Sequence, residues 1–128
     1  MKGKLTFMII GIGNDIVEIE RFNKINNFEG FVKRYYTEEE ISASKGRTSF
    51  FAGNFSVKES VSKMFGTGFR DFSLKDIEVL RDELGKPYVN LYGNAKKIAD
   101  NLGITKIFVS ISNTDTLISA VAVGEKTD

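Results

Sequence analysis

The chain of 128 residues contains neither cysteine nor histidine. Without cysteine it can form no disulfide, no thiolate nucleophile and no cysteine-ligated metal site, which fits a reducing compartment such as the cytoplasm. Without histidine it lacks the commonest general base and the commonest ligand of transition metals. Acid–base chemistry is therefore left to Asp, Glu and Lys, and a bound metal ion is expected to be one that prefers oxygen ligands.

Long apolar runs and a strong net charge are also absent. No stretch approaches membrane-spanning length, and the N-terminus lacks the apolar core and cleavage site of a signal peptide. The formal net charge is only +1, so we expect no nucleic-acid partner and no membrane association. The length fits one compact domain, which we place over residues 8–128, after an extension of residues 1–7 that is either native or left from expression.

The first half of the chain is expected to be mainly helical. Residues 8–13 indicate a short buried strand, residues 11–15 a turn, and residues 18–26 a helix. A second helix is expected to open with a capping box formed by Thr37 and Glu40, and to end near residue 46. The longest helical pattern begins at residue 48 or 49 and ends at residue 65, before the sequence Gly66-Thr67-Gly68.

The second half indicates two β-hairpins separated by one helix. Strands are expected over residues 77–81 and 88–92, and over residues 107–111 and 117–123. Between the hairpins, a helix over residues 94–102 would be capped by Asn94 and ended by Gly103. Adjacent hairpins predict an α+β domain in which antiparallel hairpins pack on the long central helix, and not a doubly wound parallel sheet.

The first candidate site is the segment Gly11-Ile12-Gly13-Asn14-Asp15, which follows a strand and carries a carboxylate. It is a poor dinucleotide-binding fingerprint because Ile16 occupies the third glycine position, so a dinucleotide-dependent oxidoreductase is the weaker alternative. On local grounds, a tight turn whose Asp15 caps the next helix is the commoner arrangement.

The second candidate site is one stripe of the central helix. Glu59, Lys63 and Thr67 are each one helical turn apart, so a carboxylate, an ammonium and a hydroxyl lie on the same side. The ordinary alternative is an exposed ion pair between Glu59 and Lys63, which contributes only about 0.3–0.5 kcal/mol. Together, Asp15 and Glu59 match the one or two carboxylates that hold Mg²⁺ on a phosphate substrate, with Lys63 as a phosphate contact.

Four segments resemble, in order, the motifs of the holo-acyl-carrier-protein synthases, the small stand-alone phosphopantetheinyl transferases. They are residues 11–19, 55–68, 85–87 and 109–112, and the resemblance extends over nearly the whole chain from Met8 onward. One segment alone would be weakly specific, whereas four in order are highly specific. The resemblance implies that the enzyme transfers the 4′-phosphopantetheine arm of coenzyme A to a serine of apo-acyl carrier protein, releasing 3′,5′-ADP.

The resemblance also implies roles for individual residues. Asp15 and Glu59 would bind Mg²⁺ on the coenzyme A pyrophosphate, and Lys63 completes the expected catalytic set. The coenzyme A contacts would be Lys45, Arg47, Lys58, Lys63, Gly66, Thr67, Gly68, Pro87, Ser112, Asn113 and Thr114. The acidic carrier protein would meet Arg21, Lys24 and Arg34, although such short basic runs are by default solvated faces. The family further implies a homotrimer with each site at a subunit interface.

Two positions depart from the family pattern. Asn54 and Asn113 stand where the family commonly has arginine and histidine, so positive charge near the substrate phosphates is reduced or is compensated by Lys45, Arg47 and Lys58. We expect an active enzyme because Asp15, Glu59 and Lys63 are present, and the base that accepts the serine proton is either Glu59 or a water on Mg²⁺. The alternative is a catalytically impaired carrier-protein or nucleotide-binding module of the same fold.

Overall fold

The computed structural model describes residues 6–66 and 71–128. Thr67 and Gly68, two of the expected coenzyme A contacts, lie outside these described residues. The helices and strands, in chain order, are β1 (Phe7–Glu18), α1 (Ile19–Asn23), α2 (Phe28–Tyr35), α3 (Glu38–Ser44), α4 (Thr48–Phe65), the 3₁₀ helix η1 (Leu74–Asp76), β2 (Ile77–Arg81), β3 (Pro87–Leu91), α5 (Gly93–Leu102), β4 (Lys106–Asn113) and β5 (Leu117–Thr127).

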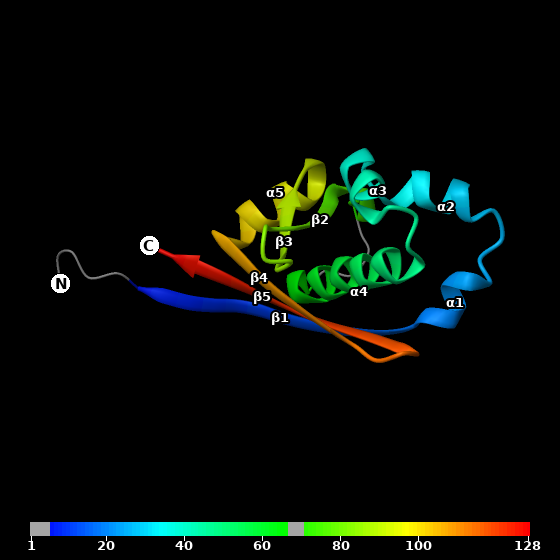
Figure 1. Ribbon diagram of the computed structural model, residues 1–128. Coiled ribbons are helices and arrows are strands. Elements are labelled where there is room, and N and C mark those ends of the chain that lie inside the picture. Colours follow the sequence, from blue (N-terminus) through cyan, green and yellow to red (C-terminus); the bar gives the residue numbers. More distant parts are fainter. Residues whose placement is uncertain (1–5, 67–70) are drawn as a thin grey trace.

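Helix α4 is the centre of the molecule (Figure 1). On one side it lies along a three-stranded antiparallel sheet with the order β1-β5-β4. On its other side lie the two-stranded sheet β2-β3 and the helices α2, α3 and α5. Because both sides are covered, most residues of α4 are buried, including the small polar residues Ser56, Ser60 and Ser62. The predicted α+β class, with antiparallel strands packed on a long helix, is confirmed.

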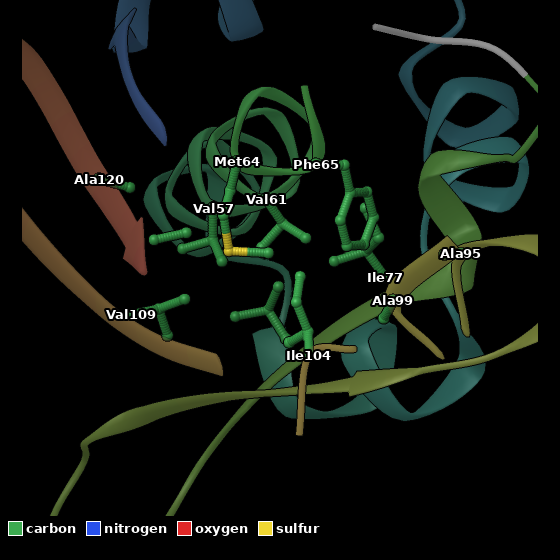
Figure 2. Close-up of a cluster of buried hydrophobic side chains, with 12 residues drawn as sticks. Val57, Val61, Met64, Phe65, Ile77, Ala95, Ala99, Ile104, Val109 and Ala120 are labelled. Atoms are coloured by element: carbon green, nitrogen blue, oxygen red, sulfur yellow. The ribbon is translucent and has the colours of Figure 1, made fainter. Parts of the chain in front are cut away.

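Two apolar clusters hold these layers together. The first joins α4 to both sheets and to α5, and Figure 2 shows its side chains converging below α4, among them Val57, Val61 and Ile104. The second is largely aromatic and joins α4 to α1 and α2, where Phe22 contacts Phe55 edge to face at a centroid distance of 5.4 Å. The position of α4 is therefore set from all sides by side-chain packing.

The expected turn at residues 11–15 is wrong, because the chain continues through it as β1, which pairs with β5 from Phe7 to Glu18. Gly11 and Gly13 allow β1 to approach α4 closely. A Cβ atom at Gly11 would lie 2.3 Å from the Met64 carbonyl oxygen, and one at Gly13 would lie 2.0 Å from the Ser60 carbonyl oxygen. Glycine is required here because any side chain would push β1 away from the helix backbone.

The helix predictions are partly corrected. The helix expected over residues 18–26 ends at Asn23, and α2 was missed although Asn27 caps it through a hydrogen bond from the Gly30 N–H. The capping box of Thr37 and Glu40 at α3 is confirmed. Asn94 does not cap α5, because that helix already begins at Gly93. Gly66 and Gly103 end α4 and α5 with positive φ angles, as expected.

Candidate functional site

Asp15 of β1 and Glu59 and Lys63 of α4 meet where the strand crosses the helix. The Lys63 Nζ lies 3.3 Å from Asp15 Oδ1, and the exposed fractions of the two side chains are 56% for Lys63 and 15% for Asp15. Lys63 therefore pairs with the carboxylate of the neighbouring strand, whereas the sequence alone indicated a pair with Glu59 one turn away. The structure brings together the three residues that were predicted to form the catalytic set.

The location of Asp15 follows from strand geometry. Side chains alternate along β1, so Asp15 faces α4 on the same side as Gly11 and Gly13, whose missing side chains permit the close approach. The Asp15 carbonyl oxygen accepts hydrogen bonds from Ser56 Oγ at 3.3 Å and from Ser119 Oγ at 3.2 Å. Asp15 thus lies within a paired strand and does not cap a helix, so the local alternative is wrong.

The pKa of the Glu59 carboxyl is raised well above its ordinary value. Burial and the nearby charge of Asp15 raise its pKa to about 7, and Lys63 lowers it only in part. Burial and the Asp15 charge both disfavour the ionised form of Glu59, so a substantial fraction of Glu59 carries a proton near neutral pH unless a cation is bound beside it. Perturbed acid groups of this kind concentrate at functional sites.

The donor set of this cluster fits Mg²⁺ bound together with a phosphate substrate. Carboxylate oxygens are hard ligands, and the mutual repulsion of Asp15 and Glu59 would be offset by a divalent cation. Within residues 6–66 and 71–128, no group of three or more acidic side chains is placed to hold a metal ion by itself. A pair of carboxylates is what Mg²⁺ takes when phosphate oxygens and water complete its octahedron.

A second part of the site is a hollow of about 480 Å³ between α4, the β2-β3 hairpin and β4. Its lining includes three of the predicted coenzyme A contacts, Arg47, Pro87 and Asn113. It also includes Arg81, which the sequence analysis missed. Arg81 follows Ile77 and Val79 at alternate positions of β2, so strand alternation could have placed it at the end of the row that faces α4.

The other predicted coenzyme A contacts among the described residues do not line this hollow. Lys45 is exposed at the end of α3, where its φ angle is 50°, and Gly66 ends α4. Ser112 is exposed on β4, and Thr114 Oγ1 accepts a hydrogen bond from the Leu117 N–H across the turn to β5. Their contacts with coenzyme A stay predictions.

Lys58 does not face the site, so its predicted phosphate contact is wrong. Its side chain is 0% exposed, and its Nζ donates to Glu40 Oε1 at 2.8 Å and to the carbonyl oxygens of Leu74 and Ile77. Asn54 belongs to the same buried network, where its Nδ2 donates to Glu40 Oε2 at 2.9 Å. Asn54 therefore does not line the hollow that contains Arg47 and Asn113, contrary to the expectation that it lowers the positive charge near the substrate phosphates.

The predicted carrier-protein residues lie on the helices that follow β1. Arg21 and Lys24 are exposed on and after α1, and Lys24 pairs with Glu20. Arg34 is exposed on α2 and lines a hollow of about 480 Å³ that also reaches Glu59. Of these three residues, only Arg34 therefore shares a hollow with Glu59.

Comparison with known proteins agrees with this geometry. A family model described as the 4′-phosphopantetheinyl transferase superfamily matches residues 11–121. A holo-[acyl-carrier-protein] synthase from Lachnoclostridium phytofermentans is 51% identical over 118 residues, which cover 92% of this chain and 97% of that relative.

Solved structures show the same fold. An acyl carrier protein synthase from Plasmodium yoelii with ADP bound aligns with a TM-score of 0.87 and 32% identity, covering 96% of this chain and 99% of that one. A holo-[acyl-carrier-protein] synthase from Helicobacter pylori in complex with coenzyme A aligns with a TM-score of 0.80 and 31% identity, covering 88% and 98%. With the converging Asp15, Glu59 and Lys63, these matches show that the chain belongs to the holo-acyl-carrier-protein synthase family of 4′-phosphopantetheinyl transferases.

Proposed function

We propose that this chain transfers 4′-phosphopantetheine from coenzyme A to a serine of apo-acyl carrier protein, with Mg²⁺ held by Asp15 and Glu59. The observation that carries the proposal is the meeting of Asp15, Glu59 and Lys63 at one crossing of β1 and α4. In the reaction, the serine oxygen forms a bond to the β-phosphorus of coenzyme A, and the bond from that phosphorus to the leaving 3′,5′-ADP breaks. The proton of the serine hydroxyl passes to a base, for which Glu59 is the candidate that the chain itself supplies.

The residues of the cluster divide the work between binding and electrostatics. When bound, Mg²⁺ offsets negative charge on the phosphoryl oxygens. Lys63 is more than half exposed, so its ammonium can leave Asp15 and contact a substrate phosphate without a large desolvation cost. Little covalent help is needed, because positioning and charge stabilisation carry most of the catalysis of phosphoryl transfer.

Arg47, Pro87 and Asn113 are proposed to receive the adenosine end of coenzyme A in the hollow beside α4. The Helicobacter pylori relative supports this substrate because its structure is a complex with coenzyme A. Arg21, Lys24 and Arg34 are proposed to bind the acidic carrier protein, because they are exposed and Arg34 adjoins the hollow that reaches Glu59.

A homotrimer is proposed because the outer face of the three-stranded sheet is apolar. Ile12, Val123 and Phe108 form one cross-strand row on that face, with Ile12 68% and Phe108 41% exposed. Ser112 lies on the same face, so its coenzyme A contact would be made to the site of a neighbouring subunit. Light scattering should give three times the chain mass of 14.3 kDa, whereas a monomeric mass would contradict this part of the proposal.

The proposed cellular compartment rests on two observations. Among the described helices, none has the length and apolar character to cross a bilayer. The absence of cysteine fits a reducing compartment, and we therefore place the enzyme in the cytoplasm. A role in fatty acid biosynthesis, and so in lipid metabolism, follows if the carrier protein served is that of fatty acid synthesis.

The direct test uses the purified chain with Mg²⁺, coenzyme A and an apo-acyl carrier protein. Intact mass spectrometry should show the carrier gaining the mass of one phosphopantetheine arm. A carrier whose acceptor serine is replaced by alanine should gain nothing, and a chelator should stop the reaction. If several apo-carriers gained no mass while coenzyme A still bound, the catalytically impaired alternative would be favoured.

The pKa of Glu59 predicts a pH dependence of Mg²⁺ binding. Its carboxyl must lose a proton to coordinate the ion, and its pKa is raised to about 7 in the metal-free protein. The Mg²⁺ affinity measured by calorimetry should therefore be about tenfold weaker near pH 6 than near pH 8. An affinity that stayed constant over this range would contradict a role for Glu59 as a ligand.

The same raised pKa has an opposite consequence for the metal-free protein. Because folding favours the neutral form of Glu59, its contribution to the free energy of unfolding is present below the ordinary pKa near 4.5. This contribution is lost as the pH rises through about 7. Saturating Mg²⁺ should remove this loss, since the ion stabilises the ionised carboxylate.

A further inference from the structure

The inward positions of β1 meet successive turns of α4. Gly13 packs against the Ser60 carbonyl oxygen, and the next inward position, Asp15, meets Ser56 one turn earlier in the helix. Two strand residues advance the chain by about 6.8 Å and four helical residues by about 6 Å, so the two elements stay matched over this distance. A change in the separation of β1 and α4 would therefore move Asp15 relative to the catalytic residues of the helix.

Two buried serines of α4 attach the helix to both strands at this point. Asp15 and Ala120 are paired residues of β1 and β5, and Figure 2 shows Ala120 beside the helix. Ser56 Oγ donates to the Asp15 carbonyl oxygen at 3.3 Å, and Ser60 Oγ donates to the Ala120 carbonyl oxygen at 3.1 Å. The Ser60 hydroxyl shares its proton with the Ser56 carbonyl oxygen, at 2.8 Å. Helix α4 is thus hydrogen-bonded to both members of the strand pair that carries the Asp15 carboxylate.

A hydroxyl is suited to this position because a side chain lies between strand and helix here. At Gly11 and Gly13 the strand lies directly against the helix backbone, whereas at Asp15 the space between the two elements has to accommodate a carboxylate. Ser56 and Ser60 are both 0% exposed, so their hydroxyls link the backbones where no water competes for the hydrogen bonds. Alanine would leave this space empty and the strand without its link to the helix.

We propose that Ser56 and Ser60 are positioning residues of the transfer reaction, because their hydroxyls hold the strand of Asp15 against α4 and so fix the Asp15 carboxylate relative to Glu59. This inference rests on the proposed function. Glu59 lies between the two serines in the sequence of α4, so the hydrogen bonds act on both sides of it along the helix.

The metal proposed for this site makes such positioning important. Its two carboxylate ligands come from different elements, Asp15 from β1 and Glu59 from α4. Mg²⁺ requires near-ideal octahedral geometry, so it tolerates little variation in the separation of these ligands. Catalytic groups have to be held to within about 0.5 Å of the productive geometry, and a displacement of about 1 Å can lower the rate by roughly 100-fold.

The test replaces both hydroxyls, in the double variant Ser56→Ala with Ser60→Ala. Calorimetry gives the Mg²⁺ affinity, and the transfer assay gives kcat and the KM for the carrier protein. Mg²⁺ should bind roughly 10-fold more weakly, and kcat should fall by roughly 10- to 100-fold. The KM should change by less than about twofold, because the proposed carrier-protein contacts lie on and beside α1 and α2. Each single variant should lie between the double variant and the unchanged chain, and decides the same question if the double variant does not fold.

Ser62→Ala is the matched control, because Ser62 is likewise buried on α4 but its hydroxyl donates at 2.8 Å to the Lys58 carbonyl oxygen of the same helix. It should lower the denaturant midpoint as much as a single serine variant, yet leave the Mg²⁺ affinity and kcat within about twofold. Ser119→Ala is a second comparison, because Ser119 Oγ donates to the Asp15 carbonyl oxygen from β5 and not from the helix. It should weaken Mg²⁺ binding less than Ser56→Ala does.

Three results would overturn the positioning role. They are a double variant with the Mg²⁺ affinity and kcat of the unchanged chain, a Ser62→Ala variant that loses as much of both as the double variant, and a Ser119→Ala variant that equals Ser56→Ala. Each of them would leave the proposed function intact. An unchanged chain that bound Mg²⁺ but transferred nothing would instead contradict the proposed function, and the calorimetric comparison would still decide the role of the two serines.

Discussion

Glu59→Gln should lower kcat/KM for phosphopantetheine transfer by at least about 100- to 1,000-fold, the cost of removing one charged group from a transition-state site. The metal-free protein should unfold at the same or a higher denaturant concentration. Glutamine keeps the shape of the side chain but removes its repulsion with Asp15, which contributes to the raised pKa of Glu59. Loss of activity without loss of stability is the pattern of a catalytic residue, and not of a structural one.

Asp15→Asn should lower activity to a similar extent, and both variants should lose Mg²⁺ binding in calorimetry. Glu83→Gln is the control, because Glu83 is exposed in the turn between β2 and β3 and is remote from the cluster in the chain. It should retain full turnover. If Glu59→Gln kept more than about a tenth of the activity, neither metal binding nor general-base catalysis could be assigned to this carboxylate.

Lys58→Met should lower the free energy of unfolding by about 3–5 kcal/mol, the usual effect of removing one partner from a buried ion pair. Lys58 and Glu40 are both 0% exposed, so the variant would leave the Glu40 carboxylate buried without its cation. Lys33→Met is the matched control, since Lys33 pairs with Glu29 at the surface and is 71% exposed. That control should change stability by less than about 0.5 kcal/mol.

A second substitution separates charge from packing in this network. In Lys58→Met with Glu40→Gln, no uncompensated charge remains, so part of the lost stability should return in denaturant unfolding. If Lys58→Met instead left stability unchanged and weakened coenzyme A binding, the ion pair would not be the role of this lysine.

The buried network also changes how Asn54 is understood. Its Nδ2 donates to Glu40 and to the Val79 carbonyl oxygen, so it helps to hold β2 and α3 against α4. The sequence suggested that Asn54 and Asn113 both reduce positive charge at the phosphates, which motivated the catalytically impaired alternative. Only Asn113 lines the hollow, and Arg81 adds a charge there, so that motivation is weaker.

Local sequence patterns predicted secondary structure correctly where that structure is determined by interactions between residues a few positions apart. The capping box at Thr37, the stops at Gly66 and Gly103 and the hairpins depend on residues a few positions apart, and the structure contains them. The same reasoning mistook Gly11 to Asp15 for a turn, because glycines mark both turns and close backbone contacts. Only the packing against α4 distinguishes the two.

The sequence by itself determined the family and the α+β class, because ordered motifs and residue types carry that information along the chain. It also predicted a catalytic set of Asp15, Glu59 and Lys63, which the structure brings together. Which side chains face the site was decided only by the tertiary structure. Lys58 and Glu59 are adjacent, yet α4 turns by about 100° between them, so one is buried against Glu40 and the other faces Asp15. The position of Arg81 was likewise decided by the tertiary structure, because the side chain lies beside Phe50 and Gly53, which belong to α4 and not to its own strand.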